Sequence, residues 1–493
     1  MTLTAIDLFC GGGGTSTGLA LAAEELDREI ELIPVNHWSV AIETHQQNHP
    51  WADHYNASVE ELHPPALFDG DPDVDLLVAS PECTHFSRAR GGKPIKEQQR
   101  ASPWHVVDWL EKLNVDAVLV ENVPDMKSWG PVRDGEPSRN GEIFEAWIDS
   151  LHALGYSVDW KILNSANYGD ATSRKRLFVV GRKEKRAQFP EPTHSPDGHN
   201  GTEPYRSAAE IIDWDDCGES IWSRSRPLVQ NTMQRIAEGL RRYTHDALEP
   251  FADAVEELGK PEVSKLQENI VEAEHVPRVA AEVDEPFLAC APTVGLAADG
   301  GEIEDVCGSF VLGQHGGAVA RDLGCPLPTI ATKGAIGLYH PEAFILPRNG
   351  YHGGLHSNPA YRPEERPLHT VTASNHDGHF VVPYLVEYYG NGSAQSIDDP
   401  LPTVTTKDRF ALVVPECYPW GLDIRFRMLQ PRELAAAMGF PDDYQFSGNK
   451  TETTKQIGNA VPVNLAKALC KTLLTGEQPS LQTFADQEVP CDD

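Results

Sequence analysis

The stretch Thr4-Ala-Ile-Asp-Leu-Phe-Cys-Gly-Gly-Gly-Gly14 begins with apolar residues typical of a buried strand and ends in four consecutive glycines. Glycines directly after a strand let the backbone pass close to a ligand and expose amide groups at the start of a helix. Thr15 or Ser16 can then cap a helix that continues through Ala23. This succession predicts the first unit of an open α/β sheet, with a ligand site at the glycines.

The glycine turn differs from the fingerprint of a dinucleotide site. That fingerprint requires a third glycine where Ser16 stands. A nicotinamide cofactor is therefore disfavoured, whereas a smaller cofactor that carries adenosine is compatible with the turn. His37 and Trp38 follow the second predicted strand, where such folds hold ribose and adenine, and they offer a hydrogen bond and a stacking face.

Strands and helices alternate regularly in the first part of the chain, up to about residue 182. Helices are predicted to begin at Ser39 and at Ser102, where Pro103 stands at the first helical position. Alternation of this kind predicts an α/β fold with a mostly parallel sheet covered by helices on both faces. Further apolar, β-prone runs that predict strands lie at 31–36, 74–79, 115–120 and 176–181.

The alternation stops after residue 182, where Pro, Gly and His become frequent, and helical patterning returns from Pro431. The middle of the chain is therefore predicted to be a second domain inserted in the first. The predicted segments are a cofactor-binding domain (1–182), a large, irregular, β-rich insert (183–424), helices that complete the first domain (425–475) and an acidic, disordered tail (476–493).

Within the insert, acidic residues are dense between 246 and 305. Three similar segments begin at Pro326, Pro367 and Pro400, and each precedes an apolar run. They indicate β-hairpin-like repeats over about 310–415, which either contact a ligand or are duplicated structural hairpins.

The composition bounds the class of protein. The chain has 493 residues, 74 acidic against 41 basic side chains and a net charge of −33, which argues against a protein that simply coats nucleic acid. An acidic surface suits a salt-rich cytoplasm and indicates a halophilic source. Alternatively, the acidic residues are confined to one segment.

No apolar run reaches the roughly 18 residues of a membrane span, and the N-terminus lacks a basic leader, so a cytoplasmic protein is expected. Nine cysteines without a Cys-x-x-Cys pair argue against a metal site and a disulfide framework.

Two reactive side chains are predicted to meet at one edge of the sheet. Cys83 follows the strand predicted over 74–79, and Glu121 ends the strand over 115–120. A lone cysteine is usually an inert apolar residue, and its thiol, with an ordinary pKa of about 8.5, needs nearby positive charge to become a nucleophile. A buried glutamate can protonate a ring nitrogen, so the pair suits addition of a thiolate to an electron-poor ring. Basic side chains available for this edge are Arg88, Arg90, Lys93, Arg174 and Arg176.

Six blocks of the sequence resemble, in the expected order, the motifs of the DNA (cytosine-5)-methyltransferases, within residues 4–182 and 424–470. Any one block would be weak, but six in order are specific. They are Asp7-Leu-Phe-Cys-Gly-Gly-Gly-Gly14, Cys83-Thr-His-Phe-Ser87, Glu121-Asn-Val123, Tyr168-Gly-Asp-Ala-Thr-Ser-Arg-Lys-Arg176, Arg432-Glu-Leu-Ala-Ala-Ala-Met-Gly-Phe-Pro441 and Gln456-Ile-Gly-Asn-Ala-Val-Pro462.

This resemblance implies a Rossmann-like methyltransferase that moves a methyl group from S-adenosylmethionine to carbon 5 of a flipped-out cytosine in double-stranded DNA. Cys83 would attack C6, Glu121 would engage N3 and Arg176 would hold O2. Asn122 would position Glu121, and Arg174 is the other arginine of this catalytic set. The residues implied at the cofactor are Phe9, Gly11, Gly13, Gly14, His37, Trp38, Ser58 and Asn459.

The resemblance also implies two DNA-binding regions. The loop over 88–100, with Arg88, Arg90 and Lys93, is expected to close over the DNA, and the insert is expected to recognise the target sequence. A helix predicted over 224–243 gives the insert a local basic face with Arg235, Arg241 and Arg242. A monomer is expected, with a cognate restriction endonuclease as a candidate partner.

Four positions depart from the family pattern. Glu82 occupies the place of the proline before the nucleophile, His37 that of the ribose-binding acid, Ser58 that of the adenine-binding acid, and Thr172 that of the glutamine before Arg174. These changes affect cofactor affinity more than chemistry.

Two alternatives to a DNA methyltransferase are an RNA cytosine-5 methyltransferase and a catalytically silent DNA-binding relative. The large insert disfavours the first, because a tRNA-modifying relative needs only a small recognition region. The presence of both Cys83 and Glu121 disfavours the second.

Overall fold

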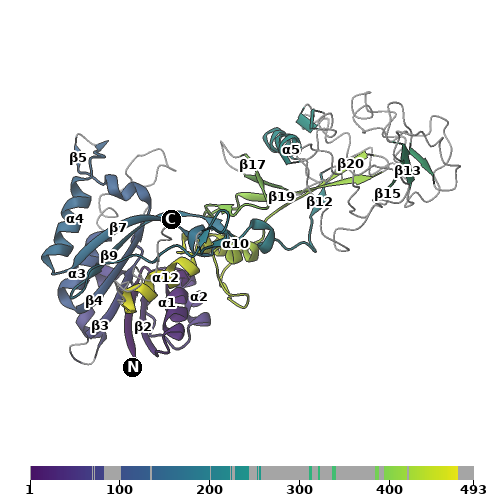
Figure 1. The fold of residues 1–493 in the computed structure, drawn as a ribbon. Coiled ribbons are helices and arrows are strands. Elements are labelled where there is room, and N and C mark those ends of the chain that lie inside the picture. Colours follow the sequence, from purple (N-terminus) through teal and green to yellow (C-terminus); the bar gives the residue numbers. More distant parts are fainter. Residues whose placement is uncertain are drawn as a thin grey trace, which may run out of the picture. The chain divides into compact units, whose positions relative to one another are not determined.

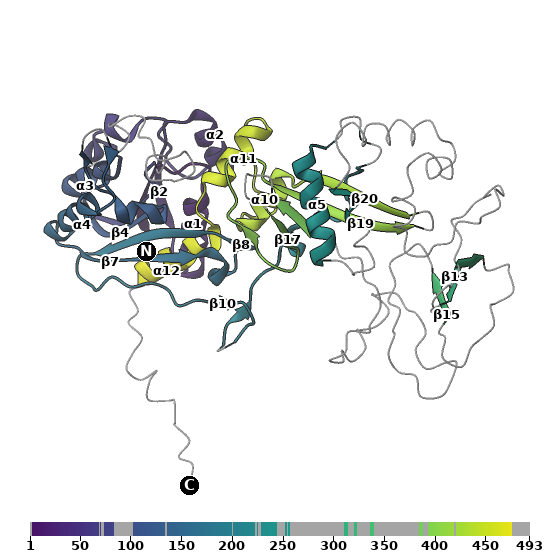
Figure 2. The ribbon, with the colours of Figure 1, turned by 90° about the horizontal axis from the view of Figure 1, so that it is seen from above.

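The computed structural model describes most of the first two hundred residues, most of the residues between 393 and 475, and short pieces between these two parts. The chain divides into two compact units. The first comprises 1–212, 398–408 and 430–493, and the second comprises 213–397 and 409–429 (Figures 1 and 2). The described residues are 2–68, 70, 73–82, 102–133, 136–199, 201–221, 224, 228–243, 252–253, 255–256, 310–313, 320–322, 336–339, 384–387, 393–418 and 421–475.

The first unit is built on a mixed six-stranded sheet with the order β2-β1-β3-β4-β9-β7. The four strands from β2 to β4 run parallel, whereas β9 pairs antiparallel with both β4 and β7. The predicted α/β fold with a mostly parallel sheet is therefore confirmed. The strands are β1 (Leu3–Leu8), β2 (Ile30–Val35), β3 (Asp73–Ala79), β4 (Asn114–Asn122), β7 (Ser157–Asn164) and β9 (Lys175–Arg182).

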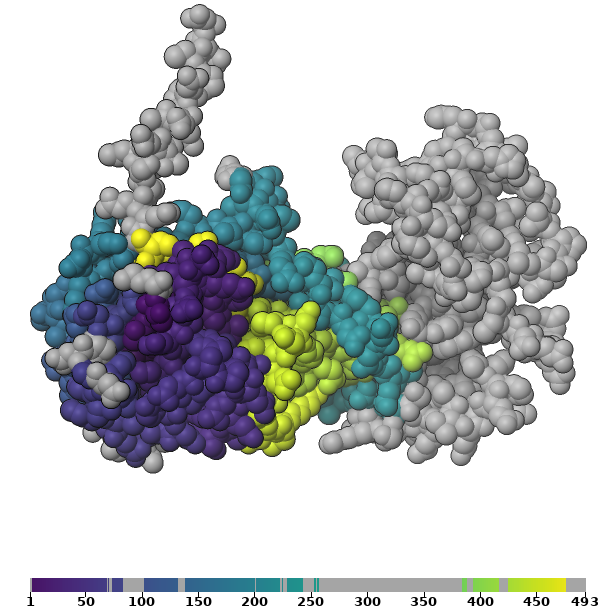
Figure 3. Space-filling model, turned by 90° about the horizontal axis from the view of Figure 1, so that it is seen from below, coloured from purple at the N-terminus to yellow at the C-terminus, as the bar shows by residue number. Residues whose placement is uncertain are grey.

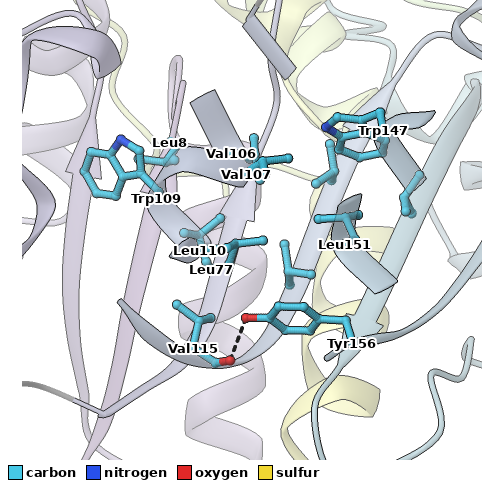
Figure 4. Close-up of a cluster of buried hydrophobic side chains, with 14 of the residues drawn as sticks. Leu8, Leu77, Val106, Val107, Trp109, Leu110, Val115, Trp147, Leu151 and Tyr156 are labelled. Atoms are coloured by element: carbon cyan, nitrogen blue, oxygen red, sulfur yellow. Dashed lines mark hydrogen bonds between the residues drawn. The ribbon is translucent and has the colours of Figure 1, made fainter. Parts of the chain in front are cut away.

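Alternate residues of these strands enter two different cores, because successive side chains point to opposite faces of a sheet. On one face Leu8, Leu77 and Val120 pack with the helices α3 (Ser102–Lys112) and α4 (Glu142–Ala153), as Figure 4 shows in part. On the other face strand residues pack with α1 (Gly14–Glu25) and α12 (Val463–Thr475). Helix α12 therefore completes the domain that β1 and α1 begin.

Close packing of α1 against α12 depends on Gly18. A Cβ atom at this position would lie 2.6 Å from the Cβ of Ala466 and 2.7 Å from the carbonyl oxygen of Val463. Two backbones approach this closely only where a side chain is missing.

The start of α1 differs from the prediction that Thr15 or Ser16 caps it. The N-cap is Gly13, whose φ of 89° lies in the left-handed region that favours glycine. The Ser16 hydroxyl instead donates to the Asp7 carboxylate below the helix, at 2.6 Å.

Shorter elements connect the main ones in the first unit. Helix α2 (Ser39–Asn48) follows β2, and helices α10 (Pro431–Ala437) and α11 (Lys450–Asn459) precede α12. Short strands and 3-10 turns are β5 (Val132–Arg133), β6 (Glu136–Pro137), β8 (Thr172–Ser173), β10 (His194–Ser195), β11 (Glu203–Pro204), β18 (Leu401–Pro402), η1 (Val59–Glu61), η2 (Pro64–Leu67), η5 (Pro124–Ser128), η6 (Ser165–Tyr168) and η7 (Ala208–Ile211).

The second unit is rich in β-structure, as predicted for the insert. A five-stranded sheet has the order β12-β20-β19-β16-β17, and a three-stranded sheet has the order β14-β13-β15. All of their pairings are antiparallel. The strands are β12 (Glu219–Ser220), β13 (Phe310–Gly313), β14 (Ala320–Asp322), β15 (Ile336–Tyr339), β16 (Tyr384–Glu387), β17 (Ala394–Ser396), β19 (Phe410–Tyr418) and β20 (Gly421–Met428).

The predicted repeats are only partly described. The segments that begin at Pro326 and Pro367 lie outside the described residues, as does most of the acidic region 246–305. The third segment, 400–407, was predicted within the insert, but it belongs to the first unit, where β18 pairs parallel with β8. The acidic tail from 476 also lies outside the described residues.

Within the described ranges, no helix is long and apolar enough to span a membrane.

Candidate active site

The turn after β1 has an unusual backbone. Phe9 has a φ of 61°, which is uncommon for a bulky residue and is found mostly where a functional site maintains it. Gly11 and Gly13 also have positive φ. Among the described residues, a Cβ on Gly11 would meet only the Phe9 carbonyl oxygen, at 3.9 Å, so none of these residues closes this side of the turn.

The other side of the turn is closed by the C-terminal segment. A Cβ on Gly12 would lie 3.3 Å from the Gln456 side chain, and one on Gly14 would lie 2.3 Å from the Val461 carbonyl oxygen. The first and last family-like blocks, distant in sequence, therefore contact each other. Figure 3 shows the C-terminal segment (yellow) beside N-terminal residues (purple) on one face of this unit.

Polar side chains form a buried layer below the turn. Asp7 is buried, and burial raises the pKa of its carboxyl group to about 7. The Thr17 hydroxyl donates to the Gly13 carbonyl oxygen at 2.7 Å and lies 3.1 Å from His49 Nε2. This layer was not predicted from the sequence, because Asp7 lies in a strand and Thr17 in a helix, and no motif marks the two together as a site.

Three histidines continue this layer. His45 Nδ1 lies 2.8 Å from His54 Nε2, and the His45 and His49 rings have centroids 4.7 Å apart. Burial lowers the pKa of His49 to about 4 and the pKa of His45 well below its ordinary value, so both are neutral near pH 7. The one available signal is the i, i+4 spacing of His45, in α2, and His49, the residue that directly follows this helix.

The predicted cofactor residues have different environments. His37 is exposed and Trp38 is half-buried, with Lys455 Nζ 4.2 Å from the centre of its ring. Ser58 forms a capping box with Glu61 at the start of η1, which gives its hydroxyl a structural role. Asn459 is exposed at the end of α11. Phe9, Gly11 and Gly13 lie in the turn, and Gly14 begins α1.

The predicted acid lies at the end of β4, where the parallel strand β3 also ends. Glu121 is nearly buried, with 12% of its side chain exposed, and its Oε1 lies 3.3 Å from Arg176 Nε. Burial raises the pKa of Glu121, and the charges of Arg176 and Arg174 together with a hydrogen bond to Ser80 only partly offset this effect. The carboxyl group therefore stays protonated to higher pH than an ordinary glutamate.

The neighbouring residue connects this acid to the segment of the predicted nucleophile. The Asn122 side chain donates from Nδ2 to the Pro81 carbonyl oxygen at 3.0 Å, and its Oδ1 accepts from the amide of Val123 at 2.9 Å. Pro81 precedes Cys83 by only two residues in sequence. Cys83 itself, Arg88, Arg90 and Lys93 lie outside the described residues.

Side chains of the block 168–176 form hydrogen bonds with backbone carbonyl groups of later segments of the same unit. The Arg174 guanidinium donates to the carbonyl oxygens of Val404, at 2.7 Å, and Gly458, at 3.1 Å. Thr172, at the place of the family glutamine, donates to the Pro402 carbonyl oxygen at 3.0 Å. Arg174 thus has a structural role in addition to the effect of its charge on Glu121, whereas Arg176 contacts the acid directly.

The three predicted DNA-binding arginines of the insert lie on helix α5 (Gln230–Tyr243). Arg241 already contacts Asp253 and Glu256, each at 2.6 Å. The apolar face of the helix is buried, and Tyr384 donates to the Ile236 carbonyl oxygen at 2.6 Å. The opposite face lines an open hollow of about 720 Å³ formed by Asn231, Gln234, Arg235, Glu238, Arg241, Arg242 and Glu256.

Comparison with known proteins identifies the class. The sequence matches the family described as C-5 cytosine-specific DNA methylase over residues 3–244 and 365–475, which is more than half of the chain. The chain belongs to this family, and its fold is the α/β methyltransferase fold with a β-rich insert. It is therefore a methyltransferase of the class that modifies cytosine in DNA.

Curated relatives include Type II methyltransferases. M.AgeI of Thalassovita gelatinovora is 23% identical over 488 residues, which cover 95% of this chain and 98% of M.AgeI. M.HgiBI of Herpetosiphon aurantiacus is 31% identical, but over only 38% of this chain and 40% of its own.

Solved structures of methyltransferases are similar to the chain. EhMeth of Entamoeba histolytica covers 97% of this chain with 10% identity and a TM-score of 0.47. A DNMT2 mutant of Spodoptera frugiperda covers 96% with 16% identity and a TM-score of 0.45.

Proposed function

We propose that this protein transfers a methyl group from S-adenosylmethionine to carbon 5 of a flipped-out cytosine in a specific double-stranded DNA sequence, through a covalent bond between Cys83 and C6. The observation that carries the proposal is the pairing of nearly buried Glu121 with Arg176. Asn122 links this pair to Pro81, next to the nucleophile segment.

The glycine turn fits the proposed cofactor. The side of the turn at Gly11 that no described residue closes, with the start of α1 beside it, would accept an amino acid carboxylate, because helix N-termini attract anions. Trp38 would contact the adenine, and Lys455 Nζ lies over the Trp38 ring. His37 would take the place of the ribose-binding acid, and Asn459 would line the cofactor. When bound, S-adenosylmethionine supplies an electrophilic methyl group.

The residues of the chain then have separate tasks. The Cys83 thiolate adds to C6 of the cytosine while Glu121 donates its proton to N3, so that electron density moves to C5. Arg176 neutralises the carboxylate and holds O2. After C5 is methylated, water takes the C5 proton and the S–C6 bond breaks, which restores the thiolate. The N3 proton returns to the Glu121 carboxylate, so that the neutral aromatic ring and the protonated acid are both restored.

The second unit would supply target recognition, with double-stranded DNA as the partner and a monomer as the working form. A Type II context also makes a cognate endonuclease a candidate partner. An RNA substrate is the second candidate, which the large insert disfavours.

Bisulfite sequencing of DNA from cells that express this chain tests the proposal and reveals the target. We expect 5-methylcytosine at one short recurring sequence, and none when Cys83→Ala replaces the wild type. Methylation confined to RNA in the same cells would favour the second candidate, and methylation of neither would contradict the proposal. Purified enzyme should be assayed from low to molar salt, because the net charge of −33 suits a salt-rich medium.

Replacing Arg235, Arg241 and Arg242 together by alanine is expected to weaken DNA binding at least tenfold near 0.1 M salt, on the order expected for the loss of several phosphate contacts. Arg241→Ala alone should have a small effect, because Asp253 and Glu256 already neutralise this side chain. Fluorescence anisotropy across a salt series measures both. Arg206→Ala, which removes an arginine paired with Glu210 in the first unit, is the matched control. Unchanged binding by the triple variant would show that this face is merely solvated.

A further inference from the structure

Tyr444 contacts the closed side of the glycine turn. Its hydroxyl donates to the Gly12 carbonyl oxygen at 2.7 Å, and a Cβ on Gly13 would lie only 2.3 Å from the same hydroxyl oxygen. The side chain is 8% exposed, and its ring packs against Phe440 and Phe446, with centroids 4.7 and 5.2 Å away. The hydroxyl is therefore held against the turn by an aromatic cluster rather than by chance contact.

The segment that carries Tyr444 is fixed to α2. The Asn48 side chain donates to the Gln445 carbonyl oxygen at 2.7 Å and accepts from the Gln445 amide at 2.9 Å. The Ser447 amide donates to Thr44 Oγ1 at 2.9 Å, and Gln456 Nε2 donates to the Ser447 carbonyl oxygen at 2.9 Å. Tyr444 thus approaches the turn from a rigid support.

The Gly12–Gly13 peptide is held at both ends. Tyr444 binds the carbonyl oxygen of Gly12, and the amide of Gly13 donates to the Cys10 carbonyl oxygen at 3.0 Å. Because a peptide unit is planar, these two bonds fix its orientation. The next carbonyl, of Gly13, accepts from Thr17, which in turn contacts His49. Consecutive glycines have wide conformational freedom, so bonds that remove this freedom before binding lower the entropic cost of binding.

We propose that Tyr444 is a positioning residue for the cofactor: its hydroxyl fixes the glycine turn in the conformation that receives S-adenosylmethionine. The inference rests on the proposed function, because it names a residue that acts on the same cofactor. Tyr444 touches no reacting atom and acts only through the backbone of Gly12.

Tyr444→Phe tests the proposal, because it removes only the hydroxyl. One buried hydrogen bond between neutral groups contributes about 1 kcal/mol, so we expect the Kd for S-adenosylmethionine to rise about fivefold by titration calorimetry without DNA. KM for the cofactor should rise similarly, whereas kcat at saturating cofactor should stay unchanged.

Tyr156→Phe is the matched control. The Tyr156 hydroxyl also donates to a backbone carbonyl oxygen, that of Val115, at 2.7 Å, and it is also buried in the first unit (Figure 4). This bond lies within the hydrophobic core at the start of β4, away from the turn. The two variants should lower Tm to similar extents, but only Tyr444→Phe should change the Kd.

Thr17→Val provides a second measurement on the same turn, because it removes the hydroxyl that binds the Gly13 carbonyl oxygen. It is expected to raise the same Kd, and it tests the proposal if Tyr444→Phe does not fold. The proposal applies only if the wild type binds the cofactor and methylates DNA. It would then be overturned if the folded Tyr444→Phe and Thr17→Val variants had the same Kd for S-adenosylmethionine as Tyr156→Phe. A wild type that binds no S-adenosylmethionine would instead contradict the proposed function.

Discussion

Cys83→Ser is expected to abolish methyl transfer, with a loss of about 10⁴-fold or more in kcat, while DNA binding stays within about twofold of the wild type. A serine hydroxyl is far less acidic than a thiol and is a weaker nucleophile, so it cannot add to C6 at neutral pH. Transfer of labelled methyl groups to a DNA fragment that contains the target measures the loss, and anisotropy measures binding.

A trapping experiment separates nucleophilic attack from other roles of the thiol. DNA with 5-fluorocytosine at the target carries a fluorine that cannot leave as the C5 proton does, so the wild type should form a denaturant-resistant adduct in the presence of the methyl donor. Cys83→Ser should form none, and Cys217→Ser, which alters a half-buried thiol of the second unit, should form the adduct normally. Full activity of Cys83→Ser would remove Cys83 as the nucleophile.

Much of the catalytic sheet could be predicted from sequence, because each buried strand is a short apolar run next to a helix or turn signal. The runs at 31–36, 74–79 and 115–120 differ from β2, β3 and β4 by no more than two residues at each end. Strand β7 was not predicted. It is an edge strand on which Trp160 and Ile162 are exposed, so it lacks the buried pattern on which such a prediction depends.

The sequence did not predict the contacts of segments that pair with residues far away in the chain. The segment 400–407 looks like the other two repeats, yet β18 pairs with β8 and Val404 accepts from Arg174. Local pattern carries no information about a partner more than two hundred residues away, so this segment was predicted in the wrong domain.

The candidate site was predictable where a side chain has intrinsic chemistry. Glu121 and Arg176 were predicted as members of one catalytic set, and in the structure Glu121 Oε1 lies 3.3 Å from Arg176 Nε. Tyr444 was not predicted, because a tyrosine in a loop after a helix resembles any aromatic core residue. Its contact with Gly12 depends on tertiary structure, because Asn48 and Thr44 hold its segment on α2.

Glu121→Gln is expected to lower kcat about 10²–10⁴-fold, the usual contribution of a positioned proton donor. Glutamine keeps the size of the side chain and its contact with Arg176, but it cannot transfer a proton to N3. Single-turnover methylation at saturating DNA and cofactor measures the chemical step. Asp116→Asn, which neutralises an exposed acid on the same strand β4, is the matched control and should keep the wild-type rate.

The pH dependence of this step gives the sharper test. Burial raises the pKa of Glu121, so its protonated form, which is the proton donor, persists to higher pH than in an ordinary glutamate. The wild-type rate should fall as the pH rises through this raised pKa, because the deprotonated carboxylate has no proton to give. Glu121→Gln should lack this decline, and Arg176→Ala, which removes a charge that lowers the pKa, should shift the decline to higher pH. A decline that remains in Glu121→Gln at the same pH would assign it to another group and remove Glu121 as the acid.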